Sequence, residues 1–242
     1  MSEAKRVFLT AEWQDLVMLN YEVDPSLLER YVPAGTGLDS FLGKTYVSLV
    51  GFRFCRTKLF GALAVPRHSD FEEVNLRLYV RRKEGEEIRR GVVFIAEIVP
   101  RKAIAATARL VYGENYVCLP MKHSVSTDGS KRTVEYQWQV KSHWCRLAAQ
   151  AIGAPQLPRE RSLEQFITEH YWGYSTQRSG GTVEYHVSHV PWQVWVSTAA
   201  GFEGDATRLY GAELGRVLQG HLSSAFIADG SPVTVFKGSR LP

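Results

Sequence analysis

Polar and apolar residues alternate most regularly between residues 73 and 81. A period of two predicts a β-strand with one apolar and one polar face. Neighbours on the same face are about 7 Å apart, so the polar side chains form a row. This row fits either the inner wall of a closed sheet that holds a small polar ligand or a solvated sheet face. The apolar set is Val74, Leu76, Leu78 and Val80, and the polar set is Glu73, Asn75, Arg77, Tyr79 and Arg81.

Further strands are predicted where β-branched and aromatic residues are concentrated. Residues 92–99 are apolar on both faces apart from Glu97, which is typical of a strand buried on both sides. A carboxylate there needs a partner or a raised pKa. Glu97 is therefore interpreted as half of a buried structural pair, with a site acid as the alternative. The other predicted strands cover residues 45–54, 116–119, 134–140, 183–187 and 192–198.

Helix signals are fewer. Asp24 and Pro25 resemble a helix cap and first turn, and residues 205–218 have helical periodicity. Ser162 and Gln165 have the spacing of a capping box, and the face that follows places His170 inward, as a core imidazole or as a catalytic group.

Several segments are less decided. Residues 103–112 are ambiguous between helix and strand, and residues 144–152 favour a strand. The polar residues 124–132 predict a turn, and Gly51 indicates a β-bulge. Asp229-Gly230 is a hairpin signal. Many short strands with two or three helices, and no repeat or boundary, predict one β-rich α+β domain over residues 1–242.

Bulk composition narrows the classes of function. The chain has 242 residues, 45% hydrophobic and 22% charged, as in ordinary globular proteins. A net charge of +4 is too small to argue for nucleic acid. Three cysteines without a Cys-x-x-Cys motif indicate neither a zinc site nor a disulfide framework. His186 and His189 fall on opposite faces of a predicted strand, so they are not expected to bind one metal ion together. Without a signal-peptide or membrane-spanning run, the expectation is a cytoplasmic protein with no membrane partner.

Common catalytic signatures are missing. The sequence contains no phosphate-binding glycine loop, no Gly-x-Ser-x-Gly and no His-Glu-x-x-His. No metal or nucleotide cofactor is therefore expected.

Several segments together resemble a known family. They are residues 70–77 (DFEEVNLR), 97–101 (EIVPR), 114–116 (ENY), 169–174 (EHYWGY) and 229–233 (DGSPV). The chain is similar to the YqjF-like proteins (domain of unknown function 2071), a bacterial family of uncharacterised function, over about residues 8–241. That family is grouped with the acetoacetate decarboxylase-like fold. The resemblance implies a mostly antiparallel curled sheet or barrel around a small-molecule cavity, with the polar row from Glu73 lining it.

Decarboxylases of this type share an ordered set of motifs that this chain resembles in part. Glu72 or Glu73 fits the acidic strand, and residues 103–105 (AIA), Arg109 and residues 112–113 (YG) follow in order. Pro-Met-Lys, ending at Lys122, replaces the Pro-Lys-Lys that carries the Schiff-base lysine. About six extra residues precede it, and Met121 stands where the first lysine would be. The missing lysine matters because a neighbouring cation activates the decarboxylase nucleophile.

Two functions are open at this point. In the first, the chain would bind a small carboxylate- or carbonyl-bearing metabolite. Arg77 and Arg109 would anchor its anionic group, and aromatic residues would form the walls of the cavity. Alternatively it would be a Schiff-base lyase or hydrolase acting on a keto acid. Lys122 would then form the imine inside the cavity, Glu73 would move protons and Arg109 would hold the carboxylate. A homodimer is compatible with the fold analogy alone. The candidate ligand-binding residues are Glu73, Asn75, Arg77, Tyr79, Glu97, Arg109, Tyr112, His170 and Trp172.

Overall fold

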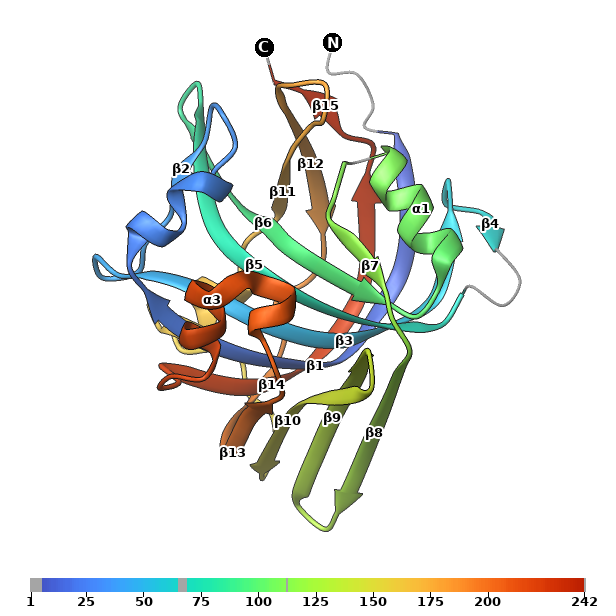
Figure 1. The fold of residues 1–242 in the computed structure, drawn as a ribbon, viewed down its shortest axis with the longest axis vertical. Coiled ribbons are helices and arrows are strands. Elements are labelled where there is room, and N and C mark those ends of the chain that lie inside the picture. The colour runs from blue at the N-terminus through green and yellow to red at the C-terminus, as the bar shows by residue number, and fades with distance from the viewer. Residues whose placement is uncertain (1–5, 65–68, 112, 242) are drawn as a thin grey trace.

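The computed structural model describes residues 6–64, 69–111 and 113–241. Most of them form strands, and the helices are short (Figure 1). The strands are β1 Val7–Val23, β2 Gly37–Leu38, β3 Thr45–Leu59, β4 Leu63–Ala64, β5 Phe71–Glu84, β6 Glu87–Val99, β7 Tyr116–Cys118, β8 Met121–Asp128, β9 Lys131–Val140, β10 His143–Ile152, β11 Trp172–Thr176, β12 Thr182–Ser188, β13 Val194–Glu203, β14 Ser224–Phe236 and β15 Ser239–Arg240. The α-helices are α1 Lys102–Val111, α2 Leu163–Thr168 and α3 Thr207–Leu218, and 3-10 turns cover Pro25–Leu27 and Glu29–Tyr31.

The strands pair in an order that brings the sheet back on itself. The path β12-β11-β6-β5-β3-β1-β14 returns to its start because β12 also pairs with β14, at Val187↔Val235 and Ser188↔Thr234. From β14 the sheet continues through β13, β10 and β9 to β8, the strands that extend below the closed part in Figure 1. Pairing is antiparallel except where β11 and β7 meet β6. The predicted β-rich, mostly antiparallel curled sheet with few helices is confirmed.

The alternation along β5 separates two hydrophobic cores. Apolar residues at even positions, such as Leu76, pack with Tyr136 of β9 and Leu214 of α3 in the outer core. Tyr79, at an odd position, belongs to a second, inner core that includes Val50 of β3. The polar row thus lies on the inner face of the closed sheet, and of the two interpretations of that row the inner wall is the one observed. Glu73, Asn75, Arg77 and Tyr79 are all buried, and only Arg81 is exposed.

Asp15 marks an irregularity in β1 that connects the two parts of the sheet. Between Gln14 and Val17 the strand gains a residue relative to β3, and Asp15 has a φ of 56°. Its carboxylate pairs with Arg53 of β3, at 2.6 Å, and with Arg132 of β9. The bulge is therefore in β1, opposite Gly51 rather than at it.

Gly51 has a different reason to be glycine. A Cβ there would lie 2.7 Å from the ring of Tyr136, so the two layers pack closely at this point.

Two turn predictions were wrong. Asp229-Gly230 is not a hairpin, because β14 runs continuously through it. Glycine is required there by a φ of 84° and by the carbonyl oxygen of Trp13, which would be 2.0 Å from a Cβ. Residues 124–132, predicted as a turn, form most of β8 and the start of β9, and the chain turns only around Gly129.

The helix predictions agree better with the structure. Ser162 accepts a hydrogen bond from the backbone N–H of Gln165 at 3.2 Å, which confirms the cap. The helix ends at Thr168, so His170 follows it. Residues 102–111 are helical, residues 143–152 form a strand, and α3 matches its predicted range to within two residues. No helix in the described ranges is long and apolar enough to cross a membrane.

Candidate functional site

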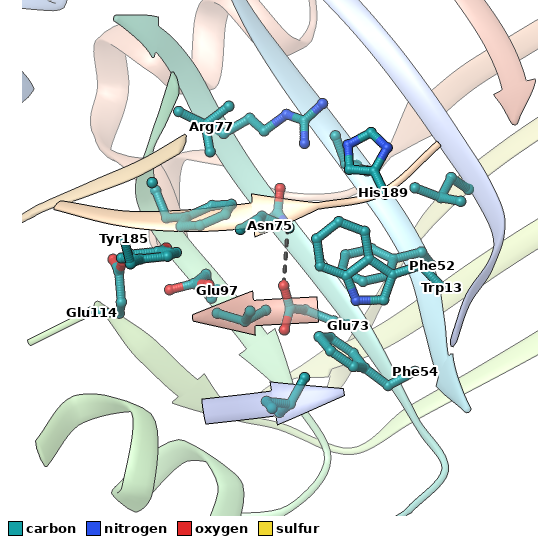
Figure 2. Close-up of a pocket in the computed structure, with 18 of the residues that line it drawn as sticks. Trp13, Phe52, Phe54, Glu73, Asn75, Arg77, Glu97, Glu114, Tyr185 and His189 are labelled. Atoms are coloured by element: carbon teal, nitrogen blue, oxygen red, sulfur yellow. Dashed lines mark hydrogen bonds between the residues drawn. The ribbon is translucent and has the colours of Figure 1, made fainter. Parts of the chain in front are cut away.

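A cavity of about 220 Å³ lies inside the closed sheet (Figure 2). It is lined by residues of β1, β3, β5, β6, β7, β11, β12 and β14 together with α1 and α2. Aromatic rings form one wall. Trp13 lies 5.2 Å from Phe52, 5.8 Å from Phe54 and 6.0 Å from Trp192, measured between ring centroids. The inward face of β5 crosses this apolar space with Glu73, Asn75 and Arg77. The site is thus an apolar pocket with a few convergent polar groups, the usual form of a small-molecule site.

Glu73 is a carboxyl group held by two neutral donors. Its Oε1 accepts a hydrogen bond from Nδ2 of Asn75, and its Oε2 accepts one from the Tyr116 hydroxyl, each at 3.1 Å. Only 2% of the residue is exposed. Burial raises the pKa of Glu73 to about 7, although both hydrogen bonds and the charge of Arg77 act in the opposite direction. Near neutral pH, Glu73 can either give or take a proton.

Two further glutamates lie on the same side of the cavity. Glu97 is the cross-strand partner of Asn75, and Glu114 precedes β7 and accepts a 3.0 Å hydrogen bond from the Tyr185 hydroxyl. Burial raises the pKa of Glu114 to about 8. Burial, reinforced by the negative charges of Glu114 and Glu73, holds the pKa of Glu97 well above its ordinary value. Figure 2 shows Glu97 between the Glu73–Asn75 pair and Glu114.

Glu97 does not form the structural ion pair that its sequence context suggested. Among the described residues it has no basic partner within salt-bridge distance, and its Oε2 atom has no hydrogen-bond partner. Burial without a cationic partner favours the neutral form of a carboxyl group.

Arg77 supplies the cation of the cavity wall. Its Nε donates to the Tyr79 hydroxyl at 3.3 Å, and its Nη2 donates to the carbonyl oxygen of Ile167 in α2 at 3.2 Å. Only 8% of the residue is exposed, and within the described ranges it forms no ion pair.

A chain of hydrogen bonds behind the wall fixes Arg77. The Tyr79 hydroxyl is 2.5 Å from the hydroxyl of Ser48, which is 2.6 Å from the amide oxygen of Asn20. Nδ2 of Asn20 in turn donates to the hydroxyl of Ser224 at 2.9 Å. Four strands, β1, β3, β5 and β14, thereby hold Tyr79 in position beneath the guanidinium group.

His170 lines the cavity from beyond the end of α2. Its Nε2 lies 3.2 Å from Oδ2 of Asp39, which also accepts a 2.7 Å hydrogen bond from Arg90. Burial would raise the pKa of Asp39, but the hydrogen bonds from His170 and Arg90 bring it below its usual value. Burial lowers the pKa of His170 to about 4. The imidazole is therefore neutral at pH 7, with its proton on Nε2 and Nδ1 as an acceptor.

The structure brings together most of the residues that the sequence singled out. Tyr79 is buried beneath Arg77, behind the cavity wall. Glu72 faces the other side of β5 and is 2.7 Å from Nδ1 of His123, so of the two candidate acids only Glu73 faces the cavity. Arg109 is in α1, but its side chain lies outside the described residues, as does Tyr112. The predicted residues that line the cavity are Glu73, Asn75, Arg77, Glu97, His170 and Trp172.

Lys122 is not at the cavity. It lies on the exposed strand β8, and its Nζ is 4.5 Å from the ring centroid of Trp144. The imine hypothesis required this lysine inside the cavity, and its position does not meet that condition. No lysine is among the described residues that line the cavity.

Sequence reasoning missed several residues of the site. Glu114 appears in the sequence analysis only within the family motif 114–116, and Tyr116 and Tyr185 only within that motif or the predicted strands 116–119 and 183–187. No sequence pattern singled out Trp13. Their common place in the cavity depends on strand pairings that no local pattern contains. Within the described ranges, no cluster of three or more His, Cys, Asp or Glu side chains could hold a metal ion.

Residues 10–232 match the model of DUF2071, a family described as uncharacterised conserved protein. The chain belongs to the DUF2071 family. A curated relative of this DUF2071 protein is the uncharacterised protein YqjF of Bacillus subtilis strain 168. It is 28% identical over 184 residues, which are 74% of this chain and 72% of the relative. The resemblance expected from the sequence motifs is thereby confirmed.

Solved structures similar to this DUF2071 protein share its fold. Acetoacetate decarboxylase from Legionella pneumophila superposes with a TM-score of 0.69 at 14% identity, covering 97% of this chain and 87% of that chain. The enduracididine biosynthesis enzyme MppR, complexed with pyruvate, gives 0.69 at 14% identity, covering 100% and 92%. An acetoacetate decarboxylase-like enzyme from Sphingomonas wittichii RW1 gives 0.69 at 13% identity, covering 96% and 92%. At these identities the likeness establishes the acetoacetate decarboxylase-like fold.

Proposed function

We propose that this protein binds a small carboxylate-bearing metabolite in the cavity inside the closed sheet. The observation that carries the proposal is Arg77, a buried guanidinium group that lines the cavity and has no carboxylate partner among the described residues. A buried charge is costly unless it is paired. The carboxylate of a ligand would complete it with charge-assisted, bidentate hydrogen bonds.

The rest of the wall fits a small ligand with an apolar body. The aromatic side chains of Trp13, Phe52 and Phe54 line the cavity. A volume of about 220 Å³ is below the roughly 300–1,000 Å³ of pockets for drug-sized molecules. One of the fold neighbours was solved with pyruvate, a small keto acid, which belongs to the proposed ligand class.

The alternative of a Schiff-base reaction through Lys122 has less support. Imine formation needs an amine in a desolvated site, and Lys122 is exposed on β8 beside Trp144. The position of Glu73 in the cavity is compatible with proton transfer to or from a bound ligand. Such a reaction would need no lysine.

The test is a thermal-shift screen of small aliphatic, aromatic and keto carboxylates against three proteins. They are the wild type, Arg77→Met and the control Arg81→Met, which removes an exposed arginine from the same strand and face. A ligand present at 100 times its Kd stabilises the folded state by about 2.7 kcal/mol. We expect the shift in the wild type and in Arg81→Met, and its loss in Arg77→Met. The proposal fails if no carboxylate stabilises the wild type, or if calorimetry on folded Arg77→Met shows undiminished binding.

A further inference from the structure

We infer that the ligand carries a protonated amine in addition to its carboxylate, and that Glu97 and Asn75 receive this amine. The inference rests on the proposed function and specifies its ligand. Several buried polar atoms of the cavity wall have no hydrogen-bond partner among the described residues, and two of them, Oε2 of Glu97 and Oδ1 of Asn75, belong to paired residues of neighbouring strands. Each residue is only 2% exposed. Buried polar atoms of native proteins nearly always have a partner. The proton of a neutral Glu97 can serve one of these two oxygens, and a ligand with several N–H donors would replace it and serve both.

The two acceptors lie next to each other. Asn75 and Glu97 are directly paired residues of β5 and β6, and cross-strand partners on one face have Cβ atoms about 5 Å apart. Nδ2 of Asn75 is engaged by Glu73, which leaves the amide oxygen as the group available to a ligand. A single ammonium group has three N–H donors and can serve both acceptors at once.

The charges around this position favour a cation over a neutral donor. Three carboxyl groups, Glu73, Glu97 and Glu114, face one part of the cavity, and no lysine is among the described residues that line it. Arg77 is separated from them by Asn75 (Figure 2). Hydrogen bonds between an ammonium and a carboxylate are about twice as strong as neutral ones. An arriving cation would therefore make Glu97 give up its proton and ionise.

The spacing along β5 sets the length of the ligand. Arg77 and Asn75 are same-face neighbours, about 7 Å apart along the strand. A carboxylate on Arg77 and an ammonium at Asn75 and Glu97 are then joined by several carbon atoms. This describes an ω-amino acid, whose methylene chain would lie against the aromatic wall of Trp13 and Phe52.

The test compares matched probes by isothermal titration calorimetry at pH 7. The probes are 4-aminobutanoate, 5-aminopentanoate and 6-aminohexanoate, the unsubstituted acids of the same lengths, and butylamine. We expect at least one amino acid to bind ten-fold or more tightly than its unsubstituted acid. Its binding enthalpy should differ between phosphate and Tris buffers, because ionisation of Glu97 releases a proton.

Two variants separate the role of Glu97 from a general charge effect. Glu97→Gln keeps the shape of the side chain but cannot ionise, so it should lose the ten-fold advantage of the amine and the proton release while still binding the unsubstituted acid. Glu86→Gln removes one exposed charge in the turn between β5 and β6 and should behave as the wild type. Thermal melting of each variant checks that it is folded.

The outcomes distinguish this inference from the proposed function. Equal binding of acids and amino acids, or an amine advantage that survives in Glu97→Gln, overturns the inference and leaves the carboxylate site in place. Binding of butylamine without binding of any acid overturns the carboxylate site and supports the cation site. If no probe binds, both are overturned.

Discussion

Oε1 of Glu73 and Nδ2 of Asn75 are joined by a 3.1 Å hydrogen bond between neighbours on the inner face of β5. The two side chains lie along the same wall (Figure 2). On this side, the Glu73 carboxyl group is oriented by a residue of its own strand, two positions away. The bond favours the ionised form of Glu73, yet burial outweighs it and the pKa rises to about 7.

This raised pKa predicts how stability depends on pH. The ordinary glutamate pKa is 4.5, so between pH 4.5 and 7 the folded protein keeps a proton that the unfolded chain has lost. The free energy of unfolding must then fall as pH rises through this window, on the order of 3 kcal/mol for this group alone. Glu73→Gln removes the contribution. In urea unfolding, we expect the variant to gain stability over the wild type from pH 5 to pH 8, and parallel curves would contradict the assignment.

Gly173 of β11 leaves room for the ring of Tyr185, the residue that donates to Glu114. A Cβ at Gly173 would lie 2.1 Å from this ring. Gly173→Ala should therefore destabilise the protein by about 1–3 kcal/mol, the usual cost of overpacking, and displace the Tyr185 hydroxyl. Gly201→Ala is the control, because a Cβ there meets nothing within 4 Å. Chemical denaturation that gives equal stabilities for the two variants would refute the role of this contact.

Asp15 connects the closed part of the sheet to the β8–β10 layer through Arg53 and Arg132. Asparagine tolerates the positive φ at this position, so Asp15→Asn tests the charge without adding backbone strain. We expect a loss of about 2 kcal/mol in the free energy of unfolding, since two partly buried cations lose their partner. The exposed pair of Arg30 and Glu213 provides the comparison, and Glu213→Gln should cost less than about 1 kcal/mol. Equal losses in the two variants would show that the Asp15 charge contributes no more to stability than an exposed ion pair does.

The exposed position of Lys122 predicts the outcome of imine trapping. After incubation with pyruvate and borohydride, peptide mass spectrometry should find no more adduct on Lys122 than on Lys131, an exposed lysine at the start of β9. Cation–π contact with Trp144 at the surface gives Lys122 no desolvated pocket in which an imine would form preferentially. Selective modification of Lys122 that is lost in Arg77→Met would restore the lyase hypothesis.

The sequence alone was sufficient for the features that depend on local periodicity. The alternation from Glu73 to Tyr79 identified the strand, its two faces and three residues of the cavity wall. It could not show that the polar face is enclosed, because closure depends on pairing between β12 and β14, whose partners Val187 and Val235 are far apart in the chain. The family resemblance supplied that step.

Long-range contacts also explain the errors. Asp229-Gly230 has hairpin composition, but the glycine is needed because the backbone of Trp13 approaches it. Glu114 was passed over because its partner Tyr185 comes from a strand 71 residues away. In both cases the role of the residue depends on a neighbour that is distant in sequence.

The alternation of cavity-facing and core-facing residues along β5 has a practical consequence for protein engineering. Positions 73, 75 and 77 can be varied to change the polarity of the cavity wall, while positions 74, 76 and 78 continue to anchor the strand in the other core. Cavity residues and supporting core residues alternate along one strand, so the cavity wall can be redesigned with its supporting hydrophobic layer left intact.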